Sequence, residues 1–349
     1  MNELIPAFSF RQVFIEPWSE TGGDYLWVVL MGFFVTAACG MTGVYLILRR
    51  MALVGDAISH SVLPGLAVAF LAGSLIAGGD ASTGHLAETG IAGGHYDFRN
   101  PTLMFIGALV AGVLTTLLIE LIHKKSRVKQ DAAIGITFSS LFAIGVILVS
   151  LFAGKVDLDA DCVLYGEIGF VAFQPFATIA GHELTPWPVL RMGVVFLLTA
   201  GLIGVFYKEL LVSSFDAGLA SSLGINPTWV HYSLMCWLSV VVVSAFEAVG
   251  AILVIAMLIL PGATAALLTH RLPVVFILVL IHSAISSLAG LHLALWLECP
   301  TAGAMVVVGA MQFCLAWMFS PEQGLLTRGR RSRVEGDLVD RHKAEAAAG

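Results

Sequence analysis

Residues 25–50 read YLWVVLMGFFVTAACGMTGVYLILRR. No Asp, Glu, Lys or Arg interrupts this run before the paired Arg49 and Arg50. A helix needs about 20 apolar residues to cross a hydrocarbon core about 30 Å thick, and residues 25–48 are long enough to do so. We therefore expect this stretch to be a membrane-spanning helix that ends at two arginines.

Similar apolar runs recur along the 349 residues, of which 58% are hydrophobic and 12% are charged, with a mean hydropathy of +0.90. Water-soluble domains contain about 25% charged residues, so this chain has too little charge to cover a surface that faces water. The sequence predicts an all-α, polytopic helical membrane protein with about nine spans in one transmembrane domain, 25–320. The predicted spans are 25–48, 51–77, 101–122, 132–154, 190–207, 229–247, 249–268, 273–296 and 301–319.

Lysine and arginine concentrate in the cytoplasmic loops of membrane proteins, and their positions test the assignment of the spans. With the amino terminus outside, 14 of the 18 Lys and Arg residues fall on the cytoplasmic side and 4 fall outside. This distribution predicts a multi-pass protein of the plasma (inner) membrane with a cytoplasmic carboxyl terminus. It requires 229–247 and 249–268 to be separate helices, and one kinked helix is the alternative.

Polar segments flank and interrupt the spans. The acidic residues 1–24 lack the basic start of a secretory signal, so we expect an extracytoplasmic amino-terminal tail. The charged residues 321–349 are expected to form a cytoplasmic tail. The loops 78–100 and 155–189 are predicted outside and are acidic enough to face a cation donor. Within the second loop, the apolar stretch 162–176 is too short to span and predicts a re-entrant segment.

Two ionisable side chains stand inside the second predicted span. Asp56 and His60 are four residues apart, so a helix places them on one face, about one turn from each other. Each such group costs about 2.5–3.5 kcal/mol inside hydrocarbon, which makes both candidates for function. If the helix begins near Arg50, His60 lies about 15 Å deep at 1.5 Å per residue. Carboxylate oxygen and imidazole nitrogen suit Mn, Fe or Zn, so the pair predicts half of a divalent-metal site.

The alternative is that Asp56 lies near the membrane surface and His60 bonds a carbonyl, with both residues only packing helices. Two ligands are too few for a closed site, so the others must come from other helices, water or backbone freed near Pro64. Glu247 is a further candidate metal ligand or outer-gate carboxylate, although it could simply reach water at the end of its span. The five cysteines are scattered singly, which gives no thiolate pair for copper(I).

The chain contains no GxxxxGK[ST] phosphate loop, so we expect it not to be an enzyme and any ATP hydrolysis to occur on a separate subunit. The polar segment 207–226 lies between two spans and carries a helix-start signal at Ser214 or Asp216. A short exposed helix with Leu219 and Leu223 on one face suits docking to a partner, and a helix lying on lipid is the alternative. The predicted ATPase-coupling residues are Ser214, Phe215, Asp216, Leu219, Leu223 and Gly224.

Five stretches carry a family resemblance: LRRMALVGDAISHSVLPG at 48–65, DAAIGITFSSLFAIGVIL at 131–148, DLDADCVLYGEI at 157–168, YKELLVSSFDAGLASSLGIN at 207–226 and VVVSAFEAVGAILVIAMLILPGATA at 241–265. Together they resemble the metal-ion permeases of ABC importers, the group that serves manganese, zinc and iron. The resemblance implies a second permease copy or paralogue, cytoplasmic ABC ATPase subunits and an extracytoplasmic metal-binding protein. It also implies that Asp56 and His60 line the translocation path and that 214–226 couples to the ATPase. We expect no resident cofactor and no nucleic-acid partner.

The form Ser-His-Ser-Val-Leu-Pro-Gly at 59–65 resembles manganese and iron members more than zinc members, which favours Mn²⁺ over Fe²⁺ or Zn²⁺ as the transported ion. One alternative is an ion-coupled secondary metal transporter, which needs no ATPase and usually shows paired repeats. Another is an intramembrane aspartyl protease, suggested by Gly55-Asp56. Aspartyl chemistry needs two carboxylates at one site, and no second Asp is expected deep in another span.

Overall fold

The computed structural model describes residues 9–19, 22–76, 101–152, 166, 168–179, 182–320 and 324. Its long helices are α2 (Gly22–Leu48), α3 (Leu53–Ile76), α4 (Pro101–Lys125), α5 (Gln130–Phe152), α7 (Trp187–Val205), α10 (Pro227–Val249), α11 (Ala251–Leu268), α12 (Leu272–Leu297) and α13 (Thr301–Phe319). Its short elements are η1 (Arg11–Ile15), α1 (Glu16–Ser19), η2 (Ile168–Phe173), β1 (Phe176–Ile179), β2 (His182–Pro186), α8 (Tyr207–Phe215) and α9 (Ala217–Ser222). Eight of the described helices are long and apolar enough to span a membrane, and the shorter apolar run Leu253–Leu268 adds a ninth. The predicted all-α polytopic fold is confirmed.

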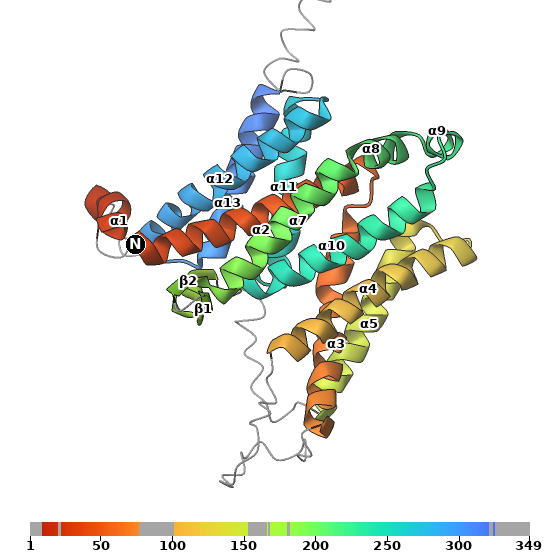
Figure 1. Cartoon of the computed structure of the whole chain (residues 1–349), viewed down its shortest axis with the longest axis horizontal. Helices are drawn as coiled ribbons and strands as arrows, with labels where there is room; N and C mark the ends of the chain where they lie inside the picture. Colours follow the sequence, from red (N-terminus) through yellow and green to blue (C-terminus); the bar gives the residue numbers. More distant parts are fainter. Residues whose placement is uncertain are drawn as a thin grey trace, which may run out of the picture.

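The helices form two groups on either side of α2 and α10 (Figure 1). In one group, α3 packs against both α4 and α5. In the other group, α12 and α13 pack against each other and against α11. α2 contacts α11, α12 and α7, while α10 contacts α4, α3 and α2. α3, which carries the candidate metal residues, packs on the rest of the protein through α10 and α11.

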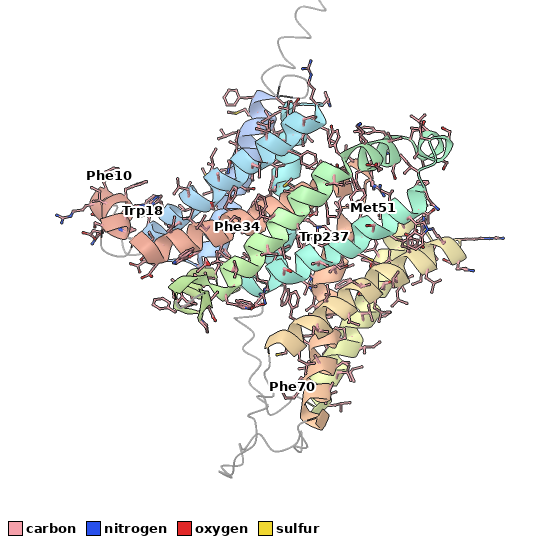
Figure 2. All side chains as sticks on the ribbon, viewed as in Figure 1. Phe10, Trp18, Phe34, Met51, Phe70 and Trp237 are labelled. Atoms are coloured by element: carbon pink, nitrogen blue, oxygen red, sulfur yellow. The ribbon has the colours of Figure 1, made fainter. Side chains whose placement is uncertain are left out.

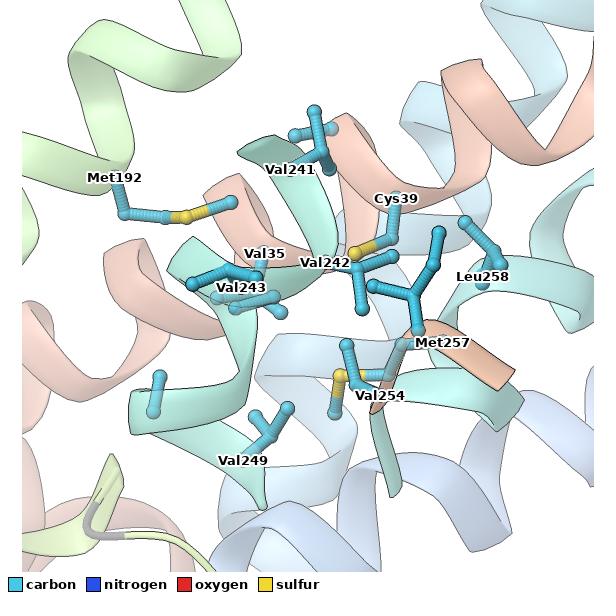
Figure 3. Close-up of a cluster of buried hydrophobic side chains, with 14 of the residues drawn as sticks. Val35, Cys39, Met192, Val241, Val242, Val243, Val249, Val254, Met257 and Leu258 are labelled. Atoms are coloured by element: carbon cyan, nitrogen blue, oxygen red, sulfur yellow. The ribbon is translucent and has the colours of Figure 1, made fainter. Parts of the chain in front are cut away.

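The most buried part of the molecule lies where α2, α10 and α11 meet (Figure 3). Val35 and Cys39 of α2, Val242 of α10 and Leu258 of α11 have no exposed surface. In lipid, close van der Waals packing rather than exclusion of water holds such helices together. Cys39 is therefore a packing residue in this core.

α10 and α11 are separate helices, as the distribution of Lys and Arg requires. α10 ends at Val249, α11 begins at Ala251, and Gly250 between them has a φ of 78°. A residue without a Cβ adopts this left-handed conformation at little cost, whereas L side chains rarely do. The Gly250 N–H donates to the Phe246 carbonyl at 2.8 Å, which closes the end of α10. The alternative of one kinked helix is wrong.

The short elements were not all predicted. β1 and β2 pair antiparallel as a two-stranded hairpin directly before α7, where the sequence indicated only a loop. Within the stretch 162–176, residues 168–173 form the 3₁₀ helix η2, which packs against α2 and α13. A re-entrant position for this stretch stays a prediction. The loop 78–100 and, apart from Gly324, the tail 321–349 lie outside the described residues.

The described part of the amino-terminal segment is helical and packs on α12. His292 Nδ1 lies 2.8 Å from the Val13 carbonyl oxygen, and the imidazole stacks on the Phe14 ring with centroids 4.6 Å apart. Phe10 and Trp18 are exposed on this short helical segment (Figure 2). Aromatic side chains are enriched at membrane interfaces, so this part of 1–24 suits a position at the edge of the bilayer.

Glycines set the closest approach between α3 and α4. A Cβ added at Gly65 would collide with the Gly107 carbonyl oxygen, and one added at Gly107 would collide with the Gly65 carbonyl oxygen. The two backbones therefore touch at this crossing, as small residues allow in membrane proteins. Gly201 in α7 differs, because nothing lies within 4 Å of the position that its Cβ would take.

We expect Gly107→Val to lower the midpoint temperature of unfolding of the detergent-solubilised protein. Overpacking of a close contact costs about 1–3 kcal/mol, and here the obstacle is backbone that cannot rotate away. Gly201→Val makes the same chemical change at an open helical position and should leave the midpoint unchanged. Thermal unfolding followed by tryptophan fluorescence compares the two variants, and equal midpoints would contradict the close approach.

Candidate functional site

Asp56 and His60 face one another on α3. His60 Nε2 lies 3.3 Å from Asp56 Oδ1, across one helical turn. α3 begins at Leu53 rather than near Arg50, so His60 lies about 10 Å along the helix at 1.5 Å per residue instead of the expected 15 Å or so. The pair is therefore nearer to the α2–α3 end of the span than to its middle.

A capped turn between α2 and α3 explains this later start. Arg50 has a left-handed φ of 58°, and the Met51 N–H donates to the Leu46 carbonyl at 2.9 Å, which closes the end of α2. Met51 is buried, and its carbonyl accepts a hydrogen bond of 3.2 Å from the Val54 N–H. Residues 49–52 thus form the turn, and α3 begins only at Leu53.

Two phenylalanine side chains of α5 lie beside His60, and α4 contacts the residue that follows it. The ring centroids of Phe138 and Phe142 on α5 lie 5.0 and 5.8 Å from that of His60. On the α4 side, the Thr115 hydroxyl lies 2.6 Å from the hydroxyl of Ser61, the residue after His60. The side chains of His60 and Asp56 are 29% and 39% exposed in the single chain. The pair is therefore held in place and still accessible from one side.

Pro64 inside α3 adds a possible oxygen ligand. Proline has no N–H, so the carbonyl of His60, four residues earlier, has no helical hydrogen-bond partner. Across the residues that the structure describes, no group of three or more His, Cys, Asp or Glu side chains could hold a metal ion. Asp56 and His60 therefore supply two protein ligands, an open arrangement that suits transient binding.

Glu247 does not join Asp56 and His60 in such a cluster. Its carboxylate forms an ion pair with the guanidinium of Arg191, near the start of α7. The same guanidinium lies over the Phe105 ring of α4, 5.0 Å from the centroid. These contacts join the end of α10 to the beginnings of α7 and α4.

α8 and α9 form the segment predicted to couple to an ATPase. Asp216 caps α9, since its Oδ1 accepts hydrogen bonds of 2.8 and 3.0 Å from backbone N–H groups of the first turn. Gly224, with a φ of 82°, follows the end of α9. Phe215, Leu219 and Leu223 are 67%, 49% and 61% exposed. The predicted helix start at Asp216 is confirmed, and the segment presents an apolar surface that no described part of the chain covers.

Behind this segment lies a polar network that sequence reasoning missed. Arg49 donates to the hydroxyls of Ser213 and Ser214 at 3.1 and 3.2 Å, and its third nitrogen lies 3.0 Å from His231 Nδ1. An arginine only donates, so His231 Nδ1 accepts and its Nε2 carries the proton. That Nε2 donates to the Glu120 carboxylate at 3.2 Å. Partial burial lowers the pKa of the Arg49 guanidinium, which stays charged at neutral pH all the same.

The network also shows which loops share one end of the molecule. The Arg49 contacts place the α2–α3 turn beside α8, and Lys124 at the end of α4 lies 3.1 Å from Glu120 and 3.2 Å from the Tyr232 hydroxyl. These segments belong to one side of the membrane in the arrangement predicted from Lys and Arg. The Arg191–Glu247 pair stands at the opposite ends of α7 and α10.

Residues 25–320 match the profile of the ABC 3 transport family. The chain belongs to this family. It is 40% identical over 306 residues to the manganese transport system membrane protein MntD of Bacillus subtilis, covering 88% of this chain and 95% of that one. It is 38% identical over 301 residues to the zinc transport system membrane protein TroD of Treponema pallidum, covering 86% of this chain and 75% of that one. The solved structure "PsaBC from Streptococcus pneumoniae in complex with Fab" is similar with a TM-score of 0.67 and 32% identity, covering 89% of this chain and 96% of that one.

These findings confirm the resemblance seen in the sequence. The chain is a membrane permease of the ABC 3 transport family and not itself an enzyme. The aspartyl protease and the secondary carrier that the sequence left open are therefore set aside. Family membership alone assigns no role to any single residue, so the site rests on the geometry of α3 and its neighbours.

We expect Glu247→Arg to lower the thermal stability of the permease, because it places two cations side by side at the ends of α7 and α10. Adding Arg191→Glu should reverse the pair and restore stability, since contacting residues do not act additively. An exposed ion pair contributes about 0–1 kcal/mol, and 1 kcal/mol shifts a midpoint by about 2–4 °C in a large domain. Midpoints measured for both single variants and the double variant test this, and a double variant no more stable than the worse single one would contradict the pairing.

Proposed function

We propose that this permease carries a divalent transition metal into the cytoplasm, with manganese preferred over iron or zinc. ATP hydrolysis on separate cytoplasmic ABC subunits drives the transport, and an extracytoplasmic binding protein delivers the ion. The observation that supports the proposal is a facing carboxylate and imidazole on a membrane span of an ABC 3 family permease. Asp56 and His60 are the residues that hold the ion in transit.

The separation of the two side chains suits a shared ion. Two ligand atoms that each lie about 2.1 Å from a metal are about 3.0–3.4 Å apart when the angle between them is about 90–109°. The distance between Asp56 Oδ1 and His60 Nε2 is 3.3 Å. A metal ion can therefore bind between the two side chains with little movement of either, and Phe138 supports the imidazole from α5.

The ligand chemistry favours manganese. The two relatives are named for different metals, so their names alone do not choose between manganese and zinc. Carboxylate and carbonyl oxygens suit Mn²⁺, whereas closed zinc sites are usually completed by four nitrogen or sulfur ligands. Asp56 supplies carboxylate oxygen, and no described group of three or more His, Cys, Asp or Glu side chains adds a thiolate to the pair.

A second permease, either another copy of this chain or a paralogue, would enclose the site. The pair is partly exposed on the face where α3 meets α5. On α5, Ile147 and Leu151 are 57% and 70% exposed, so this helix offers apolar surface beside the site. We propose that a partner permease covers this face, so that the ion passes between two subunits.

We expect Asp56→Asn and His60→Ala each to abolish metal uptake, because each removes one of two protein ligands from an open site. Uptake of Mn²⁺ by membrane vesicles that contain the full transporter measures this. Asp131→Asn is the matched control for the first change, since Asp131 is an exposed acid in the first turn of α5. His123→Ala, at the exposed end of α4, is the control for the second.

Both controls should transport at the wild-type rate. Inhibition of labelled Mn²⁺ uptake by unlabelled Mn²⁺, Fe²⁺ or Zn²⁺ in the same vesicles ranks the three ions. Unlabelled Mn²⁺ should inhibit at the lowest concentration. Unchanged uptake by Asp56→Asn or His60→Ala would remove the site assignment. Stronger competition by Zn²⁺ would leave the site in place and overturn the choice of manganese.

We also expect the double change Leu219→Asp and Leu223→Asp to prevent the ATPase subunit from copurifying with the permease. The two leucines form the exposed apolar face of α9 and its end, and a carboxylate cannot be buried there without a partner. Ser221→Asp adds a charge to the same short helix at an exposed polar position and should leave the complex intact. Copurification at the wild-type level by the double variant would favour a helix that lies on lipid instead.

A further inference from the structure

Arg49 joins two parts of the permease that have separate tasks. Its Nε and one terminal nitrogen donate to Ser214 and Ser213 of α8, and its other terminal nitrogen donates to His231 of α10. All three nitrogens of the guanidinium are thus engaged, in the fork geometry that only arginine provides. The partners lie 164, 165 and 182 residues away along the chain, so these bonds are tertiary contacts.

The position of Arg49 in the chain links these contacts to the metal pair. α2 ends at Leu48 and α3 begins at Leu53, so the turn 49–52 is the whole connection between them. Met51 within the turn is buried and lies beside the α8 end of the molecule (Figure 2). Asp56 stands in the first turn of α3. A displacement of Arg49 therefore passes through a short, hydrogen-bonded turn directly to the helix that carries the ligands.

The network contains a second carboxylate and imidazole, in Glu120 and His231, and its charges argue against a second metal site. Glu120 has the Lys124 ammonium 3.1 Å away, and His231 has the Arg49 guanidinium 3.0 Å away. Two fixed cations repel a divalent ion at these distances. Glu120 instead accepts from both His231 and Lys124, which fixes α10 against α4. The network is therefore a mechanical connection between helices.

A second contact runs from α4 back to the metal pair. Thr115 on α4, five residues before Glu120, is hydrogen-bonded to Ser61 at 2.6 Å, beside His60. α8 is thus connected to the pair through the α2–α3 turn, and α10 is connected to it through α4. The first connection passes through Arg49 and the second through His231. These two residues are hydrogen-bonded to each other.

We propose that Arg49 is a positioning residue that transmits the movement of the α8–α9 segment to α3 and thereby changes how Asp56 and His60 hold the ion. This rests on the proposed function, in which the segment docks on the ATPase. Loss of Arg49 is expected to leave the ATPase docked and active while transport is lost. The docked ATPase subunits would then hydrolyse ATP while little metal moves through the permease.

The test uses the full transporter reconstituted in lipid vesicles with its ATPase and binding protein. Mn²⁺ uptake and ATP hydrolysis are measured on the same preparation for wild type, Arg49→Gln, Arg49→Lys and Arg50→Gln. Arg50 is the neighbouring exposed arginine, so its substitution removes the same charge from the same turn. Ser213→Ala combined with Ser214→Ala removes the acceptors on α8 and leaves Arg49 in place.

We expect Arg49→Gln to reduce uptake per ATP hydrolysed by about 5-fold or more, within the range that coupling residues show. Arg49→Lys should be impaired as well, because one ammonium cannot hold three acceptors in a fork. The serine double variant should be impaired in the same direction, and Arg50→Gln should match wild type. An uptake-to-hydrolysis ratio at the wild-type level in Arg49→Gln, or full rescue by Arg49→Lys, would overturn the proposal.

A parallel loss of uptake and hydrolysis in both Arg49→Gln and the serine double variant would also overturn it, because that result assigns Arg49 to assembly alone. Failure of the proposed function has a different signature. In that case the wild-type vesicles show no ATP-dependent Mn²⁺ uptake, or Asp56→Asn transports normally.

Discussion

A charged group inside hydrocarbon needs a partner within the protein, and this requirement decides where the polar chemistry of the permease is placed. Only 12% of the residues are charged, and three carboxylates on the spanning helices have a basic partner. Asp56 faces His60 on α3, Glu247 faces Arg191 between α10 and α7, and Glu120 lies between His231 and Lys124. The first pair is partly exposed. The other two carboxylates are already held by arginine or lysine and serve to join helices.

Three irregular backbone positions lie beside these ionisable groups. Gly250 separates α10 from α11, which keeps Glu247 at a helix end where Arg191 reaches it. Pro64 leaves the carbonyl of His60 without a helical partner, next to the ligand itself. The capped turn at 49–52 sets where α3 begins, and with it the position of Asp56 and His60 along the helix. The breaks at Gly250 and Pro64 thus lie close in the chain to Glu247 and His60.

Features that depend on near neighbours in the chain were predictable. The spans follow from apolar runs, the pairing of Asp56 with His60 follows from a spacing of four residues, and the cap at Asp216 follows from local turn chemistry. The depth of His60 was overestimated because the left-handed turn before α3 leaves no mark in hydropathy. The ion pair of Glu247 joins residues 56 apart, and the contact of Arg49 with His231 joins residues 182 apart. Helical periodicity fixes a face within one helix and does not give the rotation of one helix against another.

The shallow position of the metal pair has a mechanical consequence. His60 lies about 10 Å from the start of α3, so a tilt of α3 by about 10° about the turn moves it by roughly 1.7 Å, which is comparable to the helix shifts of about 1–2 Å found in switching proteins. Such a shift is large against a metal–ligand bond of about 2.1 Å. Phe138 and Phe142 belong to α5, so a tilt of α3 alone also changes the support of the imidazole. Only the turn 49–52 separates Arg49, which contacts α8, from the helix that carries Asp56 and His60.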